Sequence, residues 1–381
     1  MQRRTALSLL SALVVVGCAD HELAGPAGSA ELTPSFASGV GSAGAVYVLT
    51  NQAAGNEVLV FGRSADGTLG SPASYATGGT GTGSGLGSQG ALVLAGSRWL
   101  LAVNAGSDDV SVFRVEHGGL TLTDRVASGG DMPISVTAHG SLVYVLNAGG
   151  PENISGFRLS PHGELTAIAG STLPLSGAGV DPAQVQFTPD GGQLVVTEKA
   201  TNQIVTYAVQ PDGSASGPVV HASSGMTPFG FAFAGRDFLI VSEAFGGAAD
   251  ASATSSYRIG QGGLALISGT VGTTETAACW AVATTNAKFA YVTNTGSGTV
   301  SGYAVGRDGR LTLLDADGVT GVTGAGSAPA DAAFSVNDRF LYTRNGGNGT
   351  VSAFQVGSDG SLSPIAGASG LPAGAVGLAA H

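Results

Sequence analysis

The sequence is short of charged residues, and this shortage argues against two classes of partner. Only 11% of its 381 residues are charged, and 15 Lys and Arg face 26 Asp and Glu, which gives a formal net charge of −11. Nucleic acids and anionic lipid surfaces are bound through clustered Lys and Arg. The sequence contains no such cluster, so neither is expected as a partner.

Cysteines and long apolar runs are also scarce. Cys18 and Cys279 are the only cysteines, so if Cys18 carries lipid, Cys279 has no partner, no disulfide framework exists and the fold must be stabilised by packing. Apolar residues make up 43% of the chain, which is ample for a core. The one sustained apolar run, Thr5–Val16, is too short to span a membrane as a mature helix.

Residues 1–18 have the organisation of an export signal. Arg3 and Arg4 precede the apolar run, and Val15-Val16-Gly17-Cys18 resembles a bacterial lipobox, in which the Cys is lipidated and becomes the new N-terminus. An ordinary signal peptide with an incidental Cys is the alternative. Residues 19–44 are rich in Ala, Gly, Ser and Pro and predict a flexible tether. We therefore expect an exported protein, lipid-anchored to the cell envelope through Cys18.

From residue 45 to the end, the chain consists of one repeat. An apolar or β-branched residue stands three places before an aromatic in seven copies, which end at Phe61, Phe113, Phe157, Tyr207, Tyr257, Tyr303 and Phe354. The aromatics are 44 to 52 residues apart, and turns rich in Gly and Pro divide each copy into four short strands. A repeat of this length with four strands is typical of a β-propeller blade.

The two ends of the repeat region predict a closed ring. The first copy begins directly at its second strand, whereas a surplus strand, 371–380, follows the seventh copy. If the surplus strand completes the first blade, the ring closes and the exposed edges of an open solenoid disappear. The predicted fold is an all-β, seven-bladed propeller of four-stranded blades over residues 45–381.

These blades resemble the lactonase family of seven-bladed propellers, which includes 6-phosphogluconolactonase-type and carboxymuconate cyclase-type proteins. The resemblance covers residues 45–380 and rests on strand pairs such as VNAGSDDVSVF and VTNTGSGTVSGY. It also rests on the prolines that open inner strands, Pro133, Pro182, Pro228 and Pro329. It implies a lactone hydrolase, although export argues against 6-phosphogluconolactone, an intracellular metabolite, as the substrate.

Two rings of positions are expected at one mouth of the central channel. The first, just inside the inner strands, comprises Gln89, Ser135, Gln184, Gly230, Cys279, Trp280 and Asp331. The second, at the ends of the second strands, comprises Thr50, Asn104, Asn147, Glu198, Glu243, Asn294 and Asn345. A lactone hydrolase needs a group that activates water and donors that stabilise the oxyanion. The resemblance implies a functional Glu at Glu198, which is the predicted catalytic base, with Arg344 or Lys199 supplying positive charge.

The other predicted ligand-binding residues share the same face: Gln184, Glu243, Lys199, Asn147, Asn294 and Asp331. The structural alternative is that Asn and Glu at these turns only cap backbone N–H groups. No cofactor is expected, although an oxygen-ligated Ca²⁺ ion held by Glu198, Glu243 and Asp331 is an alternative.

Histidine is missing from the predicted site, which leaves either a carboxylate base or a site that only binds. None of the six His residues falls in the two rings. The second functional hypothesis is therefore a non-catalytic envelope propeller that binds a sugar-like ligand or a protein partner on the same face.

Three further sequence patterns are weaker indications of function. The segment GLGSQG, Gly85–Gly90, fits a dinucleotide fingerprint but precedes a strand instead of opening a helix after one. Cys279 beside Trp280 predicts a packed core position, because no base is visible for a nucleophilic thiol. The long turn within 243–257 is either a lid over the channel or a surface insertion.

Overall fold

The computed structural model describes residues 43–117, 119–260 and 263–381. The export signal, Cys18 and the tether up to residue 42 lie outside the described residues. Within the described residues, no helix is long and apolar enough to cross a membrane.

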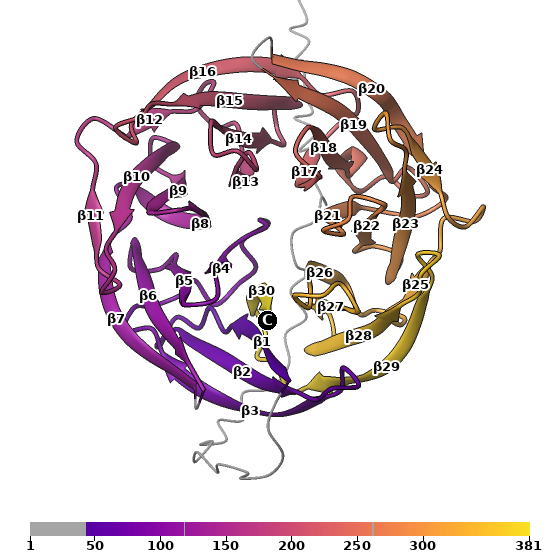
Figure 1. Ribbon diagram of the computed structural model, residues 1–381, viewed down its shortest axis with the longest axis horizontal. Helices are drawn as coiled ribbons and strands as arrows, with labels where there is room; N and C mark the ends of the chain where they lie inside the picture. The colour runs from indigo at the N-terminus through magenta and orange to yellow at the C-terminus, as the bar shows by residue number, and fades with distance from the viewer. Residues whose placement is uncertain (1–42, 118, 261–262) are drawn as a thin grey trace, which may run out of the picture.

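Seven antiparallel sheets stand around a central axis (Figure 1), which confirms the predicted propeller. The first blade contains β1 (Gly44–Leu49), β2 (Glu57–Arg63), β3 (Leu69–Ala76) and β30 (Val376–Ala380). The second blade contains β4 (Leu92–Ala95), β5 (Trp99–Asn104), β6 (Asp109–Glu116) and β7 (Gly119–Ala127). The third blade contains β8 (Asp131–His139), β9 (Leu142–Gly149), β10 (Asn153–Leu159), β11 (Leu165–Ala167) and β12 (Leu173–Pro174).

The fourth blade contains β13 (Pro182–Phe187), β14 (Gln193–Glu198), β15 (Gln203–Val209) and β16 (Ala215–Ala222). The fifth blade contains β17 (Pro228–Ala234), β18 (Phe238–Glu243), the 3₁₀ turn η1 (Phe245–Gly247), β19 (Ala253–Gly260) and β20 (Gly263–Gly272). The sixth blade contains β21 (Ala278–Ala283), β22 (Phe289–Asn294), β23 (Thr299–Val305), β24 (Leu311–Leu313) and β25 (Gly321–Val322). The seventh blade contains β26 (Pro329–Phe334), β27 (Phe340–Asn345), β28 (Thr350–Val356) and β29 (Leu362–Ser369).

The ring closes as predicted, through the C-terminal strand. β30 pairs antiparallel with β1, with Val46 opposite Ala380 and Val48 opposite Leu378. In the third and sixth blades the outer position is divided between two short strands, β11 and β12 or β24 and β25.

The core lies between neighbouring blades because their middle strands are buried on both faces. All six residues of β5 are buried, and its sequence WLLAVN is a continuous apolar run up to its last residue. Buried tyrosines also link blades through hydrogen bonds. Tyr144 donates to the Gly213 carbonyl of the next blade at 2.9 Å, and Tyr342 donates to Gly67 of the first blade at 2.8 Å.

A β-bulge near the start of the inner strand recurs in six blades. The pairing register shifts by an extra residue in β8, β13, β17, β21, β26 and β30. A bulge re-aims the side chain of its extra residue. In β26 that residue is Asp331, which has φ of +57°, a conformation that Asp tolerates better than most residues.

Candidate functional site

The inner strands present polar side chains to the channel, and most of these groups bind neighbouring strands. The Gln184 amide pairs with both backbone groups of Phe231 on the next blade: the Phe231 N–H donates to Oε1 at 2.7 Å, and Nε2 donates to the Phe231 carbonyl at 3.0 Å. Ser135 accepts a hydrogen bond from the Val185 N–H at 3.2 Å. These two side chains of the first ring therefore satisfy the inner edge of the next blade.

The segment Gly85–Gly90, which directly precedes β4 in the sequence, enters the centre of the ring (Figure 1). The Gln89 amide pairs with both backbone groups of Ala281, on the sixth blade, at 2.8 and 3.0 Å. Trp280 Nε1 donates to the Ser88 carbonyl at 2.9 Å, and the Ser88 hydroxyl donates to the Ile134 carbonyl at 2.8 Å. The segment is thus bound to the third and sixth blades.

Two adjoining cavities of about 330 and 290 Å³ occupy the channel, with the Gln89 side chain contributing to both. One is bordered by Thr285, Val336 and Asp338, which follow the ends of inner strands β21 and β26. Val336 is 66% exposed, so this end opens to solvent. The channel is therefore accessible from the face where the inner strands end, opposite the two predicted rings.

Asp331 is the most unusual polar group of the smaller cavity. Its side chain is buried, yet it borders the cavity. Oδ1 accepts a hydrogen bond from the Ala332 N–H at 2.9 Å, whereas Oδ2 has no hydrogen-bond partner among the described residues. Burial raises the pKa of Asp331 from 3.8 to about 7, although Arg344 and the amides of Ala332, Gly90 and Leu378 oppose the rise.

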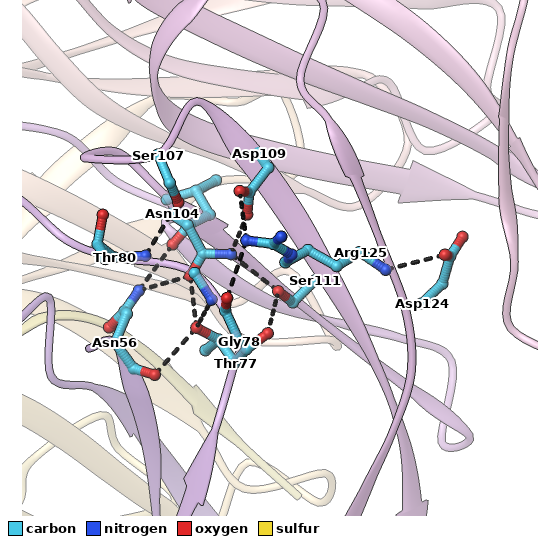
Figure 2. Close-up of polar contacts among 12 residues, drawn as sticks. Asn56, Thr77, Gly78, Thr80, Asn104, Ser107, Asp109, Ser111, Asp124 and Arg125 are labelled. Carbon is cyan, nitrogen blue, oxygen red and sulfur yellow. Dashed lines mark hydrogen bonds and ion pairs between the residues drawn. The ribbon is translucent and has the colours of Figure 1, made fainter.

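The Asn residues of the second ring are buried inside the blades. Asn345 Nδ2 donates to Thr350 and Ser352 at 2.8 Å each, and Asn294 Nδ2 donates to Thr299 and Ser301 at 3.1 and 2.8 Å. Figure 2 shows the same arrangement in the second blade, where Asn104 donates to Asp109 and Ser111.

Asn147 is a variant of this arrangement, because its Nδ2 donates to Asn153 at 2.9 Å and to the Ser128 carbonyl at 3.4 Å. The amide of each of these Asn residues joins the second strand to the third. None of them borders either cavity.

Glu198 and Glu243 replace Asn in two adjacent blades and bind the preceding loops. Glu198 Oε1 accepts a bond from the Ser176 N–H at 3.0 Å, while Oε2 accepts bonds from the Ser176 and Thr201 hydroxyls. Glu243 Oε1 accepts a bond from the Gly225 N–H at 2.7 Å, and burial raises the pKa of Glu243. Both carboxyls are fully buried and border neither cavity.

Arg344 is buried, and the Lys199 side chain is 10% exposed; neither residue borders the cavities. Lys199 Nζ donates to the Gly87 carbonyl at 2.7 Å and lies 3.1 Å from Asp181 Oδ1. Arg344, on β27, pairs with Ala330 beside Asp331, and its positive charge lowers the pKa of Asp331. Arg344 is thus placed to act through Asp331, whereas Lys199 anchors a loop.

The remaining sequence predictions fall as follows. No group of three His, Cys, Asp or Glu residues that could hold a metal ion forms in the described part of the chain, so Glu198, Glu243 and Asp331 do not converge into the calcium site considered above. Cys279 and Trp280 are buried, as expected for core positions. The long turn after Glu243 folds back onto its own blade, where the Phe245 N–H donates to the Met226 carbonyl, and it does not border the cavities.

Sequence reasoning missed the role of Gly85–Gly90 and did not separate Asp331 from the rest of its ring. The only local signal for the segment was a glycine-rich stretch longer than a blade turn requires. For Asp331 the signal was a carboxylate in a ring otherwise made of neutral side chains.

Comparisons with known proteins bear on the fold. No protein-family model matches the chain, and no curated protein matches it. A structure from Lactobacillus plantarum superposes with a TM-score of 0.72 at 18% identity, covering 89% of this chain and 99% of that one. A candidate 6-phosphogluconolactonase from Bacteroides fragilis gives 0.68 at 18%, covering 92% and 100%. The periplasmic gluconolactonase of Pseudomonas aeruginosa gives 0.68 at 17%, covering 87% and 98%.

Proposed function

We propose that this propeller hydrolyses an uncharged cyclic ester, a sugar lactone, inside its central channel, with Asp331 as general base. The observation that carries the proposal is the Asp331 carboxyl: it is buried, it borders a cavity of about 290 Å³, and Oδ2 has no hydrogen-bond partner among the described residues. A base with a pKa near the working pH is efficient, and the pKa of Asp331 is about 7. The similarity in fold to proteins named as lactonases supports this class of substrate.

The reaction follows from these groups. The Asp331 carboxylate takes a proton from water as the water oxygen attacks the lactone carbonyl carbon. The ring C–O bond of the tetrahedral intermediate then breaks, and the leaving alkoxide takes the proton from Asp331, which gives the open hydroxy acid. The positive charge of Arg344 favours the carboxylate form of Asp331 that takes the proton, while the negative charge of the intermediate develops on the former carbonyl oxygen of the lactone.

The cavity walls favour an uncharged substrate. Within the described residues, neither cavity is bordered by Lys, Arg or His, whereas Asp338 borders the open end and Asp331 the interior. A phosphate group needs a cationic partner, so a phosphorylated lactone fits poorly. The apolar walls formed by Phe231, Phe233 and Ala332 suit the carbon face of a sugar ring.

The test is hydrolysis of a panel of neutral aldonolactones and their 6-phosphates by the purified protein and two variants. Asp331→Asn should reduce kcat on the neutral lactones by about 10² or more. Glu198→Gln, a change to a buried carboxyl outside the cavities, should retain turnover. Equal rates for Asp331→Asn and wild type would overturn the assignment, and loss only in Glu198→Gln would restore Glu198 as the base.

A non-catalytic propeller that binds a sugar-like ligand is the second candidate. It is favoured because the Gln184 and Gln89 amides are both hydrogen-bonded to backbone groups. They are therefore not free to stabilise an oxyanion during catalysis by Asp331. Binding of a neutral sugar or lactone in calorimetry without any hydrolysis would select this candidate.

We also propose export and lipid attachment at Cys18, which rest on the N-terminal sequence alone. Cys18→Ala should release the protein from the membrane fraction and change its mobility. Unchanged fractionation and mobility would contradict the lipobox interpretation.

A further inference from the structure

At one level of the channel, each of the seven inner strands presents one residue to the cavities. Each of these residues pairs with the residue three places before the second ring, as Gln186 pairs with Val195 and Thr137 with Tyr144. Gln186 is the only amide among the seven, and all seven border at least one cavity. The other six are Val93, Thr137, Ala232, Val282, Ala333 and Ala379. The channel wall at this level is therefore mostly apolar, with one amide.

The orientation of the Gln186 amide is fixed by hydrogen bonds that begin on the next blade. The Phe231 N–H can only donate, so it binds Oε1 of Gln184 at 2.7 Å, which leaves Gln184 Nε2 to donate to the Phe231 carbonyl at 3.0 Å. Gln184 Nε2 also donates to Gln186 Oε1 at 3.1 Å. The oxygen of the Gln186 amide is therefore the acceptor of this pair, and its Nε2 is the end left over.

The Gln186 Nε2 has N–H groups available for a ligand. Within the part of the chain that the structure describes, this atom donates no hydrogen bond, and the half-buried Gln186 side chain borders both cavities. Other polar side chains of the cavity walls are engaged. Both ends of the Gln89 amide pair with Ala281, and Thr137 Oγ1 accepts the Phe187 N–H at 3.3 Å. A single oriented donor in a mostly apolar cavity suits one acceptor oxygen of a bound molecule.

We propose that Gln186 Nε2 binds the carbonyl oxygen of an uncharged lactone in the channel and stabilises the oxyanion formed from that oxygen. The oxyanion role rests on the proposed function, whereas the binding role needs only the cavity. The smaller cavity is bordered by this donor and by Asp331, whose Oδ2 accepts no hydrogen bond from the described residues. A donor for the carbonyl oxygen and an acceptor for the attacking water thus border the same space.

The hydrogen bonds from Phe231 through Gln184 hold the donor in place before the ligand arrives, which is the condition for effective stabilisation of a developing charge. As the water oxygen attacks the carbonyl carbon, the π electrons of the C=O bond move to the oxygen bound by Gln186. They return to the carbon when the ring C–O bond breaks. Gln186 neither gains nor loses a proton in these steps.

The first experiment measures binding without turnover. Calorimetry compares two uncharged ligands: an aldonolactam, which keeps the carbonyl oxygen but resists hydrolysis, and the corresponding anhydroalditol, in which CH₂ replaces the carbonyl. Wild type should bind the lactam about tenfold more tightly, as expected for one hydrogen bond. Gln186→Met should bind the two ligands about equally, because only the bond to the carbonyl is lost. Gln355→Met, at an exposed position of β28, is the matched control and should keep the wild-type preference.

Three results would overturn the proposal: equal affinity of wild type for the two ligands, binding of neither, or a preference for the lactam that survives in folded Gln186→Met. If Gln186→Met does not fold, Gln186→Glu is measured instead. Its carboxylate keeps an acceptor for Gln184 Nε2 but removes the donor, so the preference should again disappear. A preference retained in Gln186→Glu would also overturn the proposal.

Hydrolysis of aldonolactones is measured separately, so that the two proposals can fail independently. In Gln186→Met, KM should rise about tenfold and kcat should fall by a factor of about 10², because an N–H donor binds an oxyanion more strongly than a carbonyl oxygen. A lactam preference in a wild-type protein that hydrolyses no lactone would remove the proposed function and leave the binding role of Gln186 intact. Unchanged kcat in an active Gln186→Met variant would overturn the oxyanion role and leave Asp331 as the base.

Discussion

Replacement of Asp331 by Asn should make the stability of this propeller less dependent on pH. The substitution keeps the size of the side chain and the acceptor for the Ala332 N–H, but removes a group that ionises. Because the carboxyl is buried beside a cavity, its charge costs more in the folded protein than in the unfolded chain.

The magnitude follows from the pKa of Asp331, which is about 7 in the folded protein against an ordinary 3.8. Below pH 3.8 the Asp331 carboxyl is protonated in both the folded and the unfolded protein, so it lowers the free energy of unfolding by nothing. Between 3.8 and 7 the unfolded chain releases the proton while the folded protein keeps it, so stability falls as pH rises. The difference of about three pH units corresponds to a loss of about 4 kcal/mol, complete above pH 7.

The assay is denaturant unfolding of wild type and Asp331→Asn at intervals from pH 4 to pH 8. The free energy of unfolding of the variant minus that of wild type should increase as pH rises, by up to about 4 kcal/mol. Asp237→Asn, at an exposed position, is the matched control and should follow wild type. A difference between Asp331→Asn and wild type that is the same at every pH would refute the reasoning.

Three further outcomes are expected. Asn345→Ala removes donors to Thr350 and Ser352 inside the seventh blade and should cost about 1–3 kcal/mol in the free energy of unfolding, with turnover unchanged; a neutral effect on stability would contradict the structural role. Glu198→Gln should cost a similar amount, because an amide cannot accept all the bonds that Ser176 and Thr201 donate, and stability equal to wild type would argue against that role. Deletion of residues 371–381 removes β30 and should give an aggregating protein by light scattering, since it exposes the edge of β1; a monomeric, folded product would show that closure is dispensable.

The fold was predictable because its signal is local and repeated. Each of Phe113, Tyr207 and Tyr303 ends the same short pattern, and the number of copies and their spacing defined the blades. The missing first strand and the surplus last strand defined the closure, which the pairing of β1 with β30 confirms.

The candidate site was less predictable, because it depends on contacts between distant segments. Gln184 and Asp331 occupy the same ring in the sequence repeat, yet Gln184 finds a backbone partner in Phe231 while one oxygen of Asp331 finds no partner in the described structure. Asp331 borders the same cavity as Gly90 and Leu378, which are almost 300 positions apart in the sequence. No local pattern in the sequence encodes that meeting.

The pairing of β1 with β30 also has a consequence for the order in which the molecule folds. Val46 and Ala380 are partners separated by 334 positions in the sequence, so the first blade gains its inner strand only when these distant segments meet. Contacts of such long sequence separation form slowly, since the loop that they close must first be ordered. Until β30 pairs with β1, the first blade presents an unpaired strand edge, so ring closure is expected to be a late and slow step of folding.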